Sequence, residues 1–220
     1  MNEKASIHLF AGLEGREIGV ILAAATKRRL HKLDIIARSD QAATQLYLVH
    51  AGCINLYVLT RDGQRVLLRR LESRDAFGLG AFLTEPAGCI GTAEAVRDSE
   101  LLLWDHRLVR HLAKTYPRFL ENALQVVVNC LGLCIKRHVG LLSDSAQQRL
   151  ASALTHLAAH SGRILPRGIE IEINNEDLAS LADVSFFTAS RLLKSWERKG
   201  AVEKSRGKIL ICHPEKMLAA

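Results

Sequence analysis

The sequence lacks the features that identify most secreted, disulfide-stapled and membrane proteins. Its five cysteines are scattered and contain no CxxC motif, which argues against a disulfide framework and suits a reducing compartment. The first residues carry neither the basic start nor the apolar run of a signal peptide. Its apolar runs are expected to fall short of the roughly 18 residues that span a bilayer. We therefore expect a cytoplasmic protein with no membrane partner.

Motifs of the common enzyme classes are also missing. The sequence has no Gly-x-Ser-x-Gly motif, no P-loop and no dinucleotide fingerprint, which excludes the reactions those motifs support. His156 and His160 share a helix face at metal-ligand spacing, but neither has a neighbouring Cys or Glu in a zinc pattern. We expect neither catalysis nor a metal site.

The composition is that of a globular protein with a basic balance. Of 220 residues, 48% are hydrophobic and 24% are charged, with a net charge of +7, which favours a polyanionic partner. Residues 185–208 contain seven basic residues but only two acidic ones, Glu197 and Glu203. The basic residues are Arg191, Lys194, Arg198, Lys199, Lys204, Arg206 and Lys208. This window is either a phosphate-binding surface or an ordinary solvated helix face.

Two patterns fill residues 1–116, which we expect to form one domain. Apolar residues at helical spacing predict short helices over 7–30, with Lys27-Arg28-Arg29 at a helix C-terminus, where cations are favoured. From 31 to about 105, short β-branched and aliphatic runs alternate with turns, and Asp62-Gly63 is a hairpin signal. This spacing predicts a small antiparallel barrel or roll.

Residues 117–142 contain a heptad pattern. Pro117 opens a segment whose apolar positions recur in alternating steps of four and three, at Leu120, Leu124, Val127, Leu131, Cys134 and His138. Such a seam is typical of paired helices. We interpret it as the dimerisation helix of a homodimer; the alternative is a helix packed inside one subunit.

Residues 143–220 are expected to form a second, smaller domain. A short helix from about 178, a turn at Asp183-Val184, a basic helix capped by Ser185 and a hairpin over 201–211 follow one another. This order is that of a winged helix-turn-helix. The whole chain is therefore predicted to be α+β.

The order of these parts resembles the CRP/FNR family of bacterial transcription regulators, over nearly the whole chain. The stretches that carry the resemblance are Glu176–Ala182, Val184-Ser185, Thr188–Lys194, Trp196–Gly200 and Gly207–Ile209. Tyr47–Val49 with Ala51-Gly52, and Asp75–Gly78, resemble the family's β-roll. The resemblance implies an N-terminal sensor, control of transcription together with RNA polymerase, and a dimer that binds palindromic double-stranded DNA.

The resemblance also implies which residues read DNA. Phe186, Phe187 and Arg191 take the base-facing positions, and Ser185 and Thr188 hold phosphates, with Lys194 and Arg206 in the basic window. The Arg191 fork matches O6 and N7 of a guanine, whereas a phenyl ring can only pack on a thymine methyl group. We expect a T-rich outer half-site with one required G·C pair. One of the two phenylalanines could instead turn into the core.

The pocket in which relatives bind a cyclic nucleotide is altered. Gly78-Leu79-Gly80 and Gly91-Thr92 match the stretches that hold ribose and phosphate, but Leu79 stands where the family has glutamate and Gly91 where it has arginine. Leu79 cannot accept a hydroxyl and Gly91 brings no charge, so an unpaired phosphate would cost several kcal/mol. Cyclic AMP binding in the usual manner is therefore not expected.

Other effectors stay open. No cysteine precedes Cys53, so the clustered N-terminal ligands of an FNR-type iron–sulfur centre are missing. The alternatives are haem, with nitric oxide as its signal, an apolar ligand, a small anion, cysteine redox chemistry at Cys130 and Cys134, or no effector, with control by abundance. The rival class is a ligand-binding module that touches no DNA.

Overall fold

The computed structural model describes residues 8–218, and its mixed helices and sheets confirm the α+β prediction. Two compact units divide the chain, with the boundary between Leu133 and Cys134. The three-part division with limits at 116 and 142 stays a prediction. The first unit contains η1 (His8–Phe10), α1 (Gly15–Ala23), β1 (Thr26–Leu30), β2 (Ile35–Ala37), β3 (Gln45–Ala51), β4 (Cys53–Leu59), β5 (Arg65–Glu72), β6 (Ala76–Phe77), η2 (Leu79–Phe82), β7 (Thr92–Ala95), β8 (Ser99–Asp105) and α2 (His106–Thr115).

The first unit is an antiparallel roll of two four-stranded sheets, ordered β1-β8-β3-β6 and β2-β7-β4-β5. The Asp62-Gly63 turn joins β4 to β5 as a hairpin, as the sequence predicts. Alternate side chains of β3 show how the roll is filled, because Tyr47 and Val49 face one core while Leu46 and Leu48 face another.

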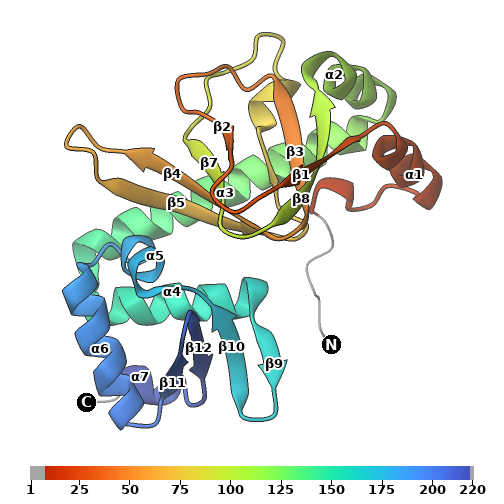
Figure 1. Ribbon diagram of the computed structural model, residues 1–220. Coiled ribbons are helices and arrows are strands. Elements are labelled where there is room, and N and C mark those ends of the chain that lie inside the picture. Colours follow the sequence, from red (N-terminus) through yellow and green to blue (C-terminus); the bar gives the residue numbers. More distant parts are fainter. Residues whose placement is uncertain (1–7, 219–220) are drawn as a thin grey trace. The chain divides into compact units, whose positions relative to one another are not determined.

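Two apolar cores result. One lies between the sheets, where the Tyr47 and Phe77 rings stack with centroids 4.6 Å apart. In the other core, α1, η2 and α2 pack against the first sheet around Trp104. Figure 1 shows α1 and α2 on the same side of the roll. Trp104 is fully buried, and its indole Nε1 donates to the Ile21 carbonyl at 2.8 Å.

The segment at 26–30 is a strand, so the prediction of helices throughout 7–30 is wrong there. Arg28 pairs with Leu101 and Leu30 with Ser99 along β8, and Leu30 is buried in the core between the sheets. The basic run Lys27-Arg28-Arg29 is therefore an exposed edge of a sheet and not the end of a helix.

The long helix α3 (Pro117–Ser143) forms where the heptad pattern predicts it. Its first turns pack against the roll through buried Phe119 and Ala123, and the Asn122 amide donates to the carbonyls of Leu9 and Ala11. By length and composition α3 could cross a membrane, so the expectation that the apolar runs are too short is wrong. Its remaining exposed apolar surface is described with the candidate site.

The second unit is built from the end of α3, α4 (Ala146–Ser161), β9 (Arg163–Leu165), β10 (Gly168–Glu172), α5 (Asn175–Leu181), α6 (Phe186–Arg198), β11 (Val202–Ser205), β12 (Lys208–Ile211) and α7 (Glu215–Leu218). Its sheet has the order β11-β12-β10-β9. Leu154 of α4, Leu178 of α5 and Trp196 of α6 meet in one core. This is the predicted helix-turn-helix with its hairpin, to which β9 adds a strand.

Candidate DNA interface and sensing site

Helix α6 begins where the sequence places its cap. The Ser185 Oγ accepts from the Thr188 backbone N–H at 3.1 Å and lies 2.9 Å from the Thr188 hydroxyl, so it satisfies one of the free N–H groups of the first turn. Ala189, Leu193 and Trp196 recur at helical spacing and are buried in the core of the unit. One face of α6 is thereby fixed, and the opposite face is left to solvent.

The exposed face carries the side chains that the sequence assigned to DNA. Phe187, Arg191 and Lys194 lie at i, i+4 and i+7, which places them on one stripe of a helix. All three are exposed. Arg198 continues the stripe one turn later. The structure thus brings an aromatic ring and three cations together on one surface.

Neither phenylalanine is part of the core. Phe187 is 83% exposed and Phe186 is 49% exposed, and their rings meet edge to face with centroids 5.9 Å apart. Phe186 lies about 100° around the helix from Phe187, toward the buried face, which explains its lower exposure. The possibility that one of the two turns inward is therefore excluded by the structure.

The cations of this surface have no acidic partners in the part of the chain that the structure describes. Within residues 8–218, no ion pair involves Arg191, Lys194 or Arg206, whereas Lys208 is paired with Glu170 at 3.1 Å. Arg206 is exposed in the turn between β11 and β12, where Gly207 has a φ of +73°. Unpaired guanidinium and ammonium groups on a helix and on its wing are available to phosphates. Lys208 is less so, because Glu170 already neutralises it.

The predicted seam of α3 is exposed. Leu120, Leu124, Val127 and Leu131 are 44 to 63% exposed, and Cys134 and His138 are exposed as well. Three further apolar residues are exposed on or beside this stripe: Val128, Ile135 and Leu142. The apolar face is therefore wider than the heptad positions predicted from the sequence. An exposed apolar face of this size, with heptad spacing, favours a partner helix.

The residues matched to the nucleotide pocket are divided between the two sheets of the roll. A side-chain carbon at Gly78 would lie 2.2 Å from the carbonyl oxygen of Gln45, and one at Gly80 would lie 3.0 Å from Ala43. Gly91 and Thr92 lie instead against β4, where a side-chain carbon at Gly91 would be 2.7 Å from the Tyr57 carbonyl oxygen. Close backbone packing therefore requires glycine at Gly78 and Gly91.

Leu79 does not offer a polar group to this region. Its side chain packs against the core that contains Trp104. Thr92 is half-buried at the start of β7. The roles of Gly78, Leu79, Gly80, Gly91 and Thr92 in binding an effector stay predictions.

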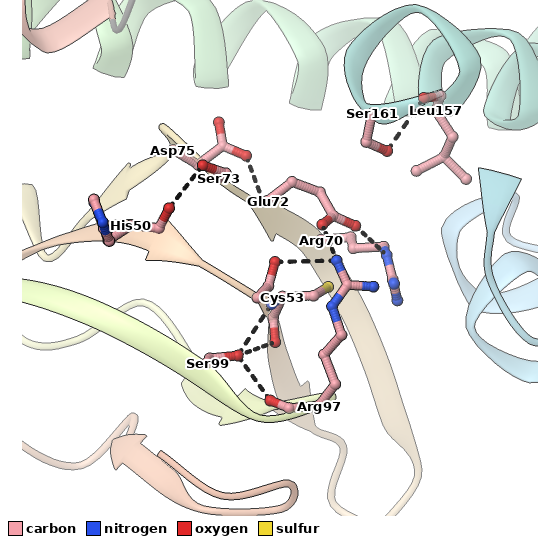
Figure 2. A network of polar contacts seen from close by, with 11 residues as sticks. His50, Cys53, Arg70, Glu72, Ser73, Asp75, Arg97, Ser99, Leu157 and Ser161 are labelled. Atoms are coloured by element: carbon pink, nitrogen blue, oxygen red, sulfur yellow. Dashed lines mark hydrogen bonds and ion pairs between the residues drawn. The ribbon is translucent and has the colours of Figure 1, made fainter. Parts of the chain in front are cut away.

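A polar network not identified from the sequence braces the end of the roll (Figure 2). Glu72 accepts from Arg70 Nε at 3.0 Å and from Arg97 Nη2 at 3.1 Å. The Ser99 hydroxyl accepts from the Cys53 N–H and donates to the Arg97 carbonyl. Burial raises the pKa of the Cys53 thiol. These groups use one another as partners, so the network holds β4, β5 and β8 together.

A second contact connects the roll with α3. Arg69 Nη1 donates to the Cys130 sulfur at 3.0 Å, and Arg69 Nη2 lies 3.7 Å from the Asp75 carboxylate. Sequence analysis missed Arg69 because the contact joins residues 61 positions apart. Cys130 thus packs on the roll, while Cys134 is on the exposed face.

Metal-binding side chains are not clustered. Among the described residues, no three His, Cys, Asp or Glu side chains gather in a metal-binding arrangement. The His156 and His160 rings lie 6.2 Å apart on α4, which is a stacked pair without a third ligand.

Comparison with known proteins matches both units. Residues 27–116 match the cyclic nucleotide-binding domain and residues 148–220 match the Crp-like helix-turn-helix domain. The chain is 26% identical to the anaerobic regulatory protein of Bacillus subtilis, covering 84% of this chain and 79% of the relative, and 28% identical to the cyclic AMP receptor protein of Thermus thermophilus, covering 91% and 90%. A mutant of CooA from Carboxydothermus hydrogenoformans has a similar structure, with a TM-score of 0.74, 25% identity and coverage of 90% and 88%.

Proposed function

Because the chain belongs to the CRP/FNR family of transcription regulators, we propose that it reads a palindromic DNA site with α6 and responds to an effector other than cyclic AMP bound in the usual mode. The chain is a DNA-binding transcription regulator with a sensing domain of the cyclic nucleotide-binding type, and its relatives are not enzymes. The homologues bind DNA and are dimeric, which fits the exposed seam of α3.

The exposed stripe of α6 carries the proposal. Arg191 and Lys194 are exposed without an acidic partner among the described residues, and Phe187 stands beside them. In a major groove, the Arg191 fork would donate to O6 and N7 of a guanine, and the Phe187 ring would pack on a thymine methyl. Ser185 and Thr188, at the N-terminus of α6, would hold a phosphate, and Arg206 would reach the backbone from the wing.

The experiment is a selection of duplexes from a randomised pool, followed by affinity measurements on the selected site. Wild-type protein should enrich a palindrome whose half-sites are one helical turn apart, and its affinity should fall steeply with salt, because phosphate contacts release counterions. Arg191→Ala should remove the preference for the guanine alone. A shallow salt dependence with no enriched sequence would instead favour a ligand-binding module that touches no DNA.

The proposal on the effector rests on two positions. Leu79 packs against the core that contains Trp104, and Gly91 has no room for a side chain next to the Tyr57 carbonyl. Neither position can supply the carboxylate or guanidinium by which family members hold ribose and phosphate. Calorimetric titration with cyclic AMP should give no heat of specific binding at micromolar ligand. Micromolar affinity would overturn this part of the proposal.

An absorption spectrum tests whether the effector acts through haem. Protein purified without oxygen and then titrated with haem would show a stoichiometric Soret band, shifted by nitric oxide, if it senses through haem. A spectrum without bands at the mass of the bare dimer would leave an organic ligand, thiol oxidation or control by abundance.

The partners and location follow from this function. A regulator of this kind works in the cytoplasm, on double-stranded DNA and together with RNA polymerase. The apolar face of α3 is then covered by a second copy of the helix and not by lipid.

A further inference from the structure

The turn of the helix-turn-helix contains an aspartate in a conformation that favours glycine. Helix α5 ends in a Schellman motif, in which the Val184 N–H donates to the Ala179 carbonyl at 3.0 Å and the Asp183 N–H to the Ser180 carbonyl at 3.3 Å. Asp183 occupies the left-handed position of this motif with a φ of +51°. Glycine is the usual residue there because it has no side chain to clash. A carboxylate in this position therefore calls for an account of what its side chain contacts.

That carboxylate is bound by an arginine from α3. Arg137 donates to both oxygens of Asp183, with Nη2 at 2.5 Å from Oδ1 and Nε bonded to Oδ2. Arg137 Nη2 also donates to the Ser180 carbonyl at 2.7 Å. A two-pronged pair of this kind fixes orientation as well as distance. Only 25% of the Arg137 side chain and 21% of the Asp183 side chain are exposed, so water competes weakly for the pair.

A second arginine holds the backbone of the same turn. Arg149 of α4 donates to the carbonyls of Ala182 and Asp183, both at 3.2 Å, and to the Asp144 carbonyl at 2.7 Å. Ser185, two residues after Asp183, is already the cap of α6. The direction in which α6 starts is therefore held by groups that belong to the end of α3 and to α4.

We infer that Arg137 is a positioning residue that fixes the direction of the recognition helix relative to the end of α3, and thereby sets the distance between the two recognition helices of a dimer. This inference rests on the proposed function, because it requires a dimer that reads two half-sites. In such a dimer the two α3 helices pair, and each carries its own α6 through the Arg137–Asp183 contact. Half-sites must lie about one DNA turn apart to meet both helices. A loosened Arg137–Asp183 contact would therefore weaken the preference of the dimer for this spacing.

The alternative is that Arg137 only stabilises the turn. Both roles predict a lower thermal stability for Arg137→Gln, so stability cannot separate them. The separating quantity is the ratio between the affinity for the palindrome and that for a single half-site, measured again with the spacer lengthened or shortened by one and two base pairs. If the substitution only loosens the turn, it weakens binding to the half-site and to the palindrome by the same factor. If it loosens the distance between the two recognition helices, it weakens binding to the palindrome alone.

The experiment uses the full-length protein and duplexes that the wild type selects from a randomised pool. Three variants are compared: Arg137→Gln, which removes the charge; Asp183→Gly, which removes the carboxylate and accepts the left-handed conformation without strain; and Lys136→Gln, which removes the neighbouring exposed charge of α3 as a control. Asp183→Gly keeps the test valid if Arg137→Gln fails to fold, because the turn gains its usual residue.

We expect Arg137→Gln and Asp183→Gly to keep half-site affinity, to lose about tenfold of the preference for the palindrome, and to tolerate altered spacers. Lys136→Gln should keep the spacing preference of the wild type. Equal losses on half-site and palindrome, or an unchanged spacing preference in both variants, would overturn the inference while leaving the proposed function intact. Failure of the wild type to enrich any duplex would overturn the proposed function and the inference with it.

Discussion

Replacing Leu131 by alanine should weaken a dimer that forms through α3. Leu131 lies on the exposed seam, and 59% of the residue is accessible in one copy of the chain. The substitution removes about three methyl-sized groups at ~0.8 kcal/mol each when fully buried. Scaled by the 59% that a partner helix would cover, this is about 1.4 kcal/mol per copy. Two-fold symmetry doubles the effect to about 3 kcal/mol, or about 100-fold in the dimer dissociation constant.

Sedimentation of fluorescently labelled protein, down to nanomolar concentration, measures this constant. Gln125→Ala is the matched control, because Gln125 is exposed on the polar side of α3 and bonds only to Asn129 of its own helix among the described residues. The control should keep the dissociation constant of the wild type. If Leu131→Ala and Gln125→Ala dimerise like the wild type, or if the wild type is a monomer at micromolar concentration, the seam is not the dimer interface.

Further measurements test individual side chains. Arg191→Lys keeps the charge but loses the planar fork, so it should reduce discrimination at the guanine position by ~1–3 kcal/mol while the salt dependence of binding stays unchanged; equal discrimination in a half-site panel would refute the base contact. Phe187→Ala should lower the preference for thymine without changing the salt slope, as read from the same panel. Ser185→Ala removes the bond to the Thr188 N–H and should lower the free energy of unfolding by ~1 kcal/mol in urea, whereas Ser185→Asp should retain it. Burial raises the pKa of the Cys53 thiol, and the thiolate is the reactive form, so Cys53 should resist a thiol reagent at pH 8 until the protein unfolds; fast labelling of native protein, located by mass spectrometry, would contradict the burial.

Because the pKa of the Cys53 thiol is raised above its ordinary value, the stability of the folded protein also depends on pH. The folded state keeps the proton at a pH at which the unfolded chain has already released it. Stability should therefore fall as the pH rises above the ordinary thiol range, and Cys53→Ser or Cys53→Ala should reduce this alkaline loss in denaturation experiments repeated at several pH values.

Local pattern was sufficient for most of the elements. The steps of four and three from Leu120 to His138 predict α3, the Ser185 cap predicts the start of α6, and Asp62-Gly63 predicts the hairpin of β4 and β5. In each case the deciding interactions lie within a few residues: periodic side chains on one helix face, a hydroxyl and an N–H three residues apart, or a turn that permits only certain residues. The structure agrees at all of these places.

The sequence by itself therefore determined the fold class, most of the elements in their order and the candidate DNA surface on α6. Only the tertiary structure decided that 26–30 is a strand, because its partner β8 lies some 70 residues away, and that both phenylalanines of α6 are exposed. The same holds for the contact of Arg137 with Asp183, which joins residues 46 positions apart. Helices and turns are determined by residues that are close in the sequence, whereas pairing between distant segments depends on which side chains the folded core brings together.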